Sequence, residues 1–168
     1  MTPPDDRAFM AQAMDEARAS IAEGGSPIGA VLVKDGTVLG RGRNRLFQDG
    51  DPTSHAEMEA YRNAARRLAE THDRLAAEDA ISGGTVYTTA MPCEMCAGAI
   101  IRFNAVRVVV GETASHPPPA TRPLMERQGI EVAVLDDAQC TALVEDYLAV
   151  HPDRREQWLV PRTAPLKL

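Results

Sequence analysis

Four residues in two short motifs could perform chemistry together. His55 and Glu57 stand in His-Ala-Glu, and Cys93 and Cys96 stand in Pro-Cys-Glu-Met-Cys. One imidazole and two thiolates are a ligand set for a tetrahedral zinc ion whose fourth position stays open, as in catalytic zinc sites. A structural zinc site needs a fourth protein ligand, and no nearby His or Cys fits that role. The motifs therefore favour a catalytic site with one Zn²⁺ per chain.

Each motif taken alone permits other interpretations. Cys-x-x-Cys is also found as a redox pair, as half of a structural zinc site, or as two unrelated thiols. A lone His at the start of a helix is more often a capping or core residue, and a Glu in the first turn is favoured by the helix dipole. The presence of both motifs in one chain favours a metal-binding site over these alternatives. The third cysteine, Cys140, is expected to be a small core residue.

Glu57 is the candidate general acid and base. Zinc lowers the pKa of a bound water to roughly 7, and a neighbouring carboxylate can move the released proton to a ring nitrogen or a leaving amine. Cys93 and Cys96 lie three residues apart at the predicted start of a helix, so both sulfurs can face one point. His55 and Glu57 lie two apart, so they can face one cleft only if the site lies beyond the end of their helix.

The elements that must position these motifs alternate between strands and helices. The predicted strands cover 28–34, 37–44, 85–89, 106–110 and 130–135, with an Asp35-Gly36 hairpin turn between the first two. Helices are predicted over 5–23, from a cap at Thr53 or Ser54 to about residue 70, from Pro92 to about 104, over 123–128 and over 136–150. Residues 45–52 are predicted as a loop, and 74–84 as loop with a short helical piece. The pattern predicts an α/β fold of three layers, α/β/α, with a mixed five-stranded sheet whose last two strands are parallel.

Composition narrows the functional classes. The chain has 168 residues, with 18 basic against 24 acidic side chains and a formal charge of −6. We expect one domain over 1–168, and we expect no nucleic acid as partner because an acidic chain binds phosphate backbones poorly. No apolar run approaches the ~20 residues of a membrane span, so no membrane is expected as partner. The start of the chain has no signal-peptide pattern, and three cysteines suit a reducing compartment, so we expect a cytoplasmic protein.

The chain resembles the cytidine deaminase superfamily, in which H-x-E with P-C-x-x-C is the zinc signature. It is most similar to the small bacterial and fungal enzymes that act on free cytosine, and to the related tRNA adenosine deaminases. The similarity runs from about Gly24 to Asp136 and more weakly to Trp158. The motifs that carry it are Pro27-Ile28-Gly29-Ala30, Gly40-Arg41-Gly42-Arg43-Asn44, His55-Ala56-Glu57, Tyr87-Thr88-Thr89, Pro92 to Ile101, and Val109-Val110-Gly111-Glu112.

The resemblance implies a cytidine-deaminase-like fold, a homodimer, and a small nucleobase as substrate, with cytosine converted to uracil and ammonia as the leading activity. His55, Cys93 and Cys96 match the zinc ligands, and Glu57 matches the proton shuttle. Further matching positions are implied to contact the substrate: Asn44, Phe47, the backbone groups of Ala56, Cys93 and Met91, and also His116 and Trp158. Trp158 belongs to the C-terminal segment, 151–168, which is implied to cover the active site.

Two departures from the cytosine enzymes bear on substrate choice. His116 stands where those enzymes have a Phe over the base, and Pro161 stands where they have an Asp that contacts the amine. Isocytosine, guanine or a pterin therefore remains an alternative substrate. A tRNA adenosine is less favoured because of the negative charge and the 4% content of aromatic residues. A structural zinc module without activity is disfavoured by Glu57, which such a module does not need.

Overall fold

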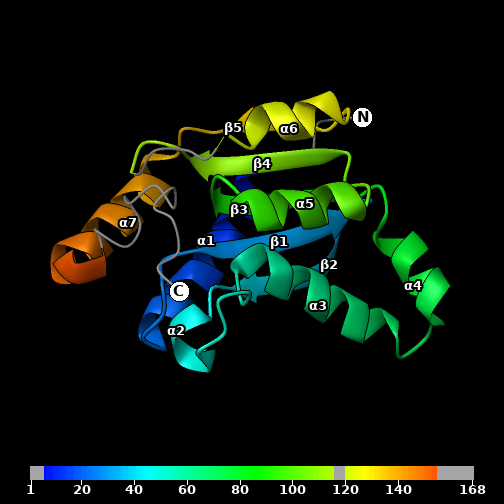
Figure 1. Cartoon of the computed structure of the whole chain (residues 1–168), viewed down its shortest axis with the longest axis horizontal. Helices are drawn as coiled ribbons and strands as arrows, with labels where there is room; N and C mark the ends of the chain where they lie inside the picture. Colours follow the sequence, from blue (N-terminus) through cyan, green and yellow to red (C-terminus); the bar gives the residue numbers. More distant parts are fainter. Residues whose placement is uncertain (1–5, 116–119, 155–168) are drawn as a thin grey trace, which may run out of the picture.

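The computed structural model describes residues 6–115 and 120–154. Helices and strands alternate as expected for an α/β fold (Figure 1). The strands are β1 (Gly29–Lys34), β2 (Thr37–Arg43), β3 (Thr85–Ala90), β4 (Arg107–Glu112) and β5 (Glu131–Val134). The helices are α1 (Asp6–Ala22), α2 (Leu46–Asp49), α3 (Ala56–Leu68), α4 (Arg74–Ile81), α5 (Glu94–Arg102), α6 (Arg122–Arg127) and α7 (Ala138–Val150).

The strands form one mixed sheet in the order β2-β1-β3-β4-β5. β1 pairs antiparallel with both β2 and β3, whereas β3–β4 and β4–β5 are parallel. The β1–β2 connection is the expected hairpin turn, because Asp35 (φ 50°) and Gly36 (φ 74°) both have the left-handed backbone of such turns. The parallel arrangement brings the carboxyl ends of β3 and β4 to the same edge of the sheet.

Helices cover both faces of the sheet, which confirms the three predicted layers. One core packs the alanines of α3 and the apolar side of α5 and α6 on the sheet residues Leu32, Val86 and Val108. The core on the other face packs α1 and α7 on the residues of opposite parity, including Val31 and Val109. Figure 1 shows this arrangement, with α3 and α5 in front of the sheet and α1 behind it. Successive side chains of a strand point to opposite faces, so this alternation decides which helix each side chain meets.

Glycines on β2 let α3 lie directly against the strand. A Cβ at Gly42 would lie 2.2 Å from the carbonyl oxygen of Ala56 and 2.3 Å from the nitrogen of Ala60. A Cβ at Gly40 would lie 2.2 Å from the carbonyl oxygen of Ala60. Only glycine permits such a close approach, so the strand sets the position at which α3 begins.

The starts of two helices differ from the sequence prediction. Thr53 and Ser54 do not cap α3, because their hydroxyls donate to the carboxylate of Asp51, at 2.7 and 3.2 Å. His55 occupies the cap position instead. Pro92 does not lie within α5, which is capped at Cys93 and begins at Glu94.

The loop predicted over 45–52 contains a helical turn, α2 (Leu46–Asp49). Arg45 and Asp49 close this turn with paired hydrogen bonds of 3.0 and 2.9 Å.

Within the described part of the chain, no helix is both long and apolar enough to cross a membrane.

Candidate metal centre and active site

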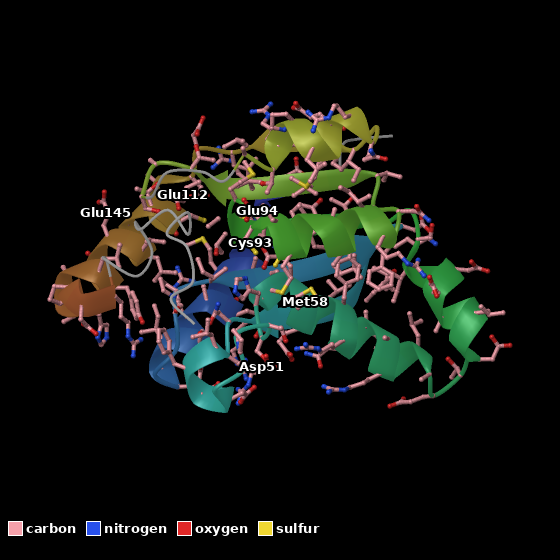
Figure 2. All side chains as sticks on the ribbon, viewed as in Figure 1. Asp51, Met58, Cys93, Glu94, Glu112 and Glu145 are labelled. Atoms are coloured by element: carbon pink, nitrogen blue, oxygen red, sulfur yellow. The ribbon has the colours of Figure 1, made fainter. Side chains whose placement is uncertain are left out.

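Two helix starts converge on the candidate metal centre. His55 is the cap residue of α3 and Cys93 is the cap residue of α5, both with extended backbone. Neither side chain caps its helix, so both are available as ligands. Figure 2 places Cys93 at the start of α5, on the side of the molecule where α3 also begins. The site therefore lies beyond the helix end, as the two-residue spacing of His55 and Glu57 requires.

The distances among the three candidate ligands fit a tetrahedral zinc ion. The two sulfurs of Cys93 and Cys96 lie 3.7 Å apart, and they lie 3.5 and 3.6 Å from His55 Nδ1. Zn–S bonds of about 2.3 Å and a Zn–N bond of about 2.05 Å at tetrahedral angles put two sulfurs about 3.8 Å apart, and each sulfur about 3.6 Å from the nitrogen. The three side chains are thus positioned to bind a metal ion, and the donor set is the one that zinc prefers.

The surroundings of Cys93 favour its thiolate form. A hydrogen bond with the Cys96 thiol is the main cause that lowers the pKa of Cys93 to about 3, and His55 contributes in the same direction. The start of α5 adds the positive end of the helix dipole. Thiolate is the form that binds metal.

Glu57 lies beside these ligands in the first turn of α3. The residue is 4% exposed, and burial raises the pKa of its carboxyl. Its Oε2 lies 3.3 Å from Cys96 Sγ, and its Oε1 accepts a hydrogen bond of 3.1 Å from the hydroxyl of Thr88 on β3. A carboxyl group with this environment, next to a metal centre, can hold and release a proton during a reaction.

Asn44 is held at the end of β2 by several hydrogen bonds. Its carbonyl oxygen accepts from the hydroxyl of Ser20 at 2.6 Å and from Gln48 Nε2 at 3.3 Å. Its side-chain Oδ1 accepts from the backbone N–H of Leu46 at 3.1 Å, which fixes the orientation of the amide. The next residue bonds through its N–H to the carbonyl of Ser54, directly before His55. These bonds attach Asn44 to the chain that leads into the metal centre.

Of the other residues predicted to contact the substrate, some are buried, one is partly exposed, and some lie outside the described residues. Ala56 and Met91 are buried, and Ala56 is the first residue of α3, where a helix supplies no backbone acceptor for its N–H. Phe47 on α2 is 37% exposed, and the guanidinium of Arg154 lies 3.9 Å from its ring centroid. His116, Trp158 and Pro161 lie outside the described residues.

Two further residues, Thr88 and Glu112, make contacts that their place in a sequence motif does not reveal. Thr88 was visible only as part of a motif, because its contact with Glu57 joins residues 31 positions apart. Glu112 is buried at the end of β4 (Figure 2), and its carboxylate accepts from the backbone N–H groups of Ala114 and Ser115 at 2.8 Å. That carboxylate therefore holds the loop after β4. Cys140 is buried in the core on the α1 and α7 face, as expected.

The known proteins to which this chain is similar include several deaminases. The model of the family "cytidine and deoxycytidylate deaminase zinc-binding region" matches residues 3–112. A cytosine deaminase of Candida albicans is 36% identical over 149 residues, which cover 88% of this chain and 92% of that protein. A tRNA-specific adenosine deaminase of Buchnera aphidicola is 40% identical over 106 residues, or 63% of this chain and 60% of that protein.

A solved structure adds a third relative. The guanine deaminase of Nitrosomonas europaea is 28% identical with a TM-score of 0.69, and the match covers 84% of each chain. The fold agrees with that of this relative, and His55, Cys93 and Cys96 are placed to bind the metal that the matched family model is named for. The chain belongs to the cytidine and deoxycytidylate deaminase family and carries its zinc-binding domain.

Proposed function

We propose that this protein is a zinc-dependent hydrolase that deaminates a free nucleobase, with cytosine as the first candidate. Water replaces the exocyclic amine: a C–O bond forms, the C–N bond breaks, and the products are the oxo base and ammonia. The observation that carries the proposal is the buried carboxyl of Glu57, with one oxygen 3.3 Å from Cys96 Sγ in a ligand set that leaves one zinc position open.

The residues around the centre have distinct roles in this proposal. When bound, the zinc ion supplies a Lewis acid that lowers the pKa of water. Glu57 takes one proton of the attacking water at Oε2 and gives it to the ring nitrogen; it then takes the second proton from the oxygen now bonded to carbon and gives it to the departing amine. The backbone N–H groups of Ala56 and Cys93 hold a carbonyl oxygen of the base, and the carbonyl of Met91 accepts from its amine. Asn44 orients the ring through the amide that Leu46 fixes.

Cytosine is the first candidate because this chain matches a cytosine deaminase over most of that enzyme's length. The cytosine deaminase of Candida albicans aligns over 92% of its length, whereas the tRNA-specific enzyme of Buchnera aphidicola aligns over 60% of its length. The net charge of −6 also disfavours a tRNA substrate. We infer in addition that the chain acts as a homodimer in the cytoplasm.

Guanine is the second candidate. The guanine deaminase of Nitrosomonas europaea shares the fold over 84% of both chains. Both bases present an amine next to a ring nitrogen, so one arrangement of Glu57 and the metal can serve either ring. The choice between them depends on side chains that surround the ring rather than on the ligands.

Ammonia release from a panel of substrates tests the proposal. Zinc-loaded protein is incubated with cytosine, isocytosine, guanine, a pterin and a tRNA that contains adenosine. We expect turnover of a free base, highest for cytosine, and none of the tRNA. Highest turnover of guanine would replace the first candidate with the second. Ammonia from the tRNA alone would contradict the proposal, as would no ammonia from any member of the panel.

A further inference from the structure

A buried hydroxyl on β3 contacts the acid-base residue. Thr88 is fully buried, and its Oγ1 lies 3.1 Å from Glu57 Oε1 and 3.2 Å from the carbonyl oxygen of Ala90. The second carboxyl oxygen, Oε2, lies 3.3 Å from Cys96 Sγ. The two oxygens of Glu57 therefore face different partners, one toward the strand and one toward the metal centre.

We propose that Thr88 is a positioning residue that acts through Glu57. Its hydroxyl holds Oε1, so that Oε2 is the oxygen that faces the metal centre and carries the proton. This inference rests on the role proposed for Glu57. The terminal torsion of a Glu side chain is broad, so the backbone alone does not fix the plane of the carboxyl group, and a hydrogen bond to one oxygen decides where the other points.

Packing alone does not require a hydroxyl at this position. Thr88 lies on the face of the sheet that Val86 also occupies, and its neighbours there are largely apolar. Valine has the same branched shape, so it would fill the site and suit the strand equally well. The hydroxyl is therefore explained by its contact with Glu57, and Thr88→Val removes this contact with little change in volume.

Three variants of the zinc-loaded protein separate positioning from packing. We expect Thr88→Val to lower kcat about tenfold or more, which corresponds to the loss of one hydrogen bond to a charged group. KM, zinc content and melting temperature should stay close to the wild type. Thr88→Ser keeps the hydroxyl and should restore most of kcat. Thr85→Val is the matched control, because Thr85 lies on the same strand with its side chain toward the opposite face.

A second background tests whether Thr88 acts through Glu57. In Glu57→Gln, the further change Thr88→Val should alter the remaining rate less than about twofold. An equal loss in both backgrounds would overturn the inference. Unchanged kcat in Thr88→Val would also overturn it, and so would equal impairment of the Ser and Val variants. If the valine variant does not fold, Thr88→Ala replaces it with the same expectations.

Crystal structures of the zinc-loaded variants give a readout that does not need turnover. We expect the Glu57 carboxyl to turn in Thr88→Val and to keep its place in Thr88→Ser. An unchanged carboxyl in both variants would refute the positioning role even if no substrate had been found. Absence of ammonia from every base with a wild-type protein would instead refute the proposed function, so the two failures can be told apart.

Discussion

Gly42→Ala is expected to damage the metal centre from a position outside it. The new Cβ would lie 2.2 Å from the carbonyl oxygen of Ala56 and 2.3 Å from the nitrogen of Ala60. Both atoms belong to the backbone of α3, so no flexible side chain can yield, and the helix must move by roughly 1 Å to restore normal packing. His55, which directly precedes Ala56, would move with it.

The size of the effect follows from this displacement. Overpacking a core costs about 1–3 kcal/mol, and two rigid contacts place this variant near the upper end. In a chain of this size, about 3 kcal/mol corresponds to a loss of roughly 6–12 °C in melting temperature. Metal ligands tolerate errors of only about 0.2 Å in bond distance. We therefore expect weaker zinc binding, and a loss of turnover of about 100-fold.

Gly98→Ala is the matched control and should act in the opposite direction. Gly98 lies within α5, and a Cβ there would meet no atom within 4 Å. Alanine is favoured over glycine in a helix by about 0.8–1.0 kcal/mol, so the melting temperature should rise by about 2–4 °C. Calorimetry and zinc titration of both variants check this. A Gly42→Ala protein with unchanged melting temperature and zinc affinity would refute the close approach of α3 and β2.

Two further predictions concern the ligands and the pH dependence of stability. Cys96→Ala should lose its zinc whereas Cys140→Ala should keep one ion per chain, as measured by metal analysis; zinc retained in the first or lost from the second would contradict the ligand set. The Arg107 guanidinium, with hydrogen bonds of 2.7 and 3.0 Å, lowers the pKa of Asp6 below its ordinary 3.8. This contribution is present above 3.8 and is lost as the pH falls through the lowered pKa. Asp6→Asn should therefore cost about 1–2 kcal/mol at pH 7, and the difference from wild type in thermal melts should shrink toward about pH 2; a constant difference would contradict it.

Much of the fold could be predicted because the inner strands are short apolar runs that are buried along almost their whole length. Helices cover both faces of β1 and β4, and continuous apolar, β-branched residues are typical of such strands. The helical turn α2 was missed because four residues carry too little periodicity. It depends on the Arg45–Asp49 pair and on Phe47, which packs under Arg154 from the far end of the chain.

The metal ligands could be predicted because His and Cys can be recognised as zinc ligands from residue type and spacing alone. His55, Cys93 and Cys96 come from two motifs whose combination has few other uses. Their partners could not be predicted in the same way. The bonds from Thr88 to Glu57 and from Ser20 to Asn44 are made by common residue types, 31 and 24 positions away in the chain. The packing of α3 and α1 on opposite faces of the sheet brings these residues together.

The rate of ammonia release by Glu57→Gln, with zinc measured in the same sample, tests the central claim most directly. Gln has the size of Glu and can still accept the Thr88 hydrogen bond, but it cannot take up and return a proton. The account predicts one zinc per chain, an unchanged melting temperature, and a loss of at least about 100-fold in kcat. A variant that keeps more than about a tenth of the wild-type rate would contradict the role of Glu57.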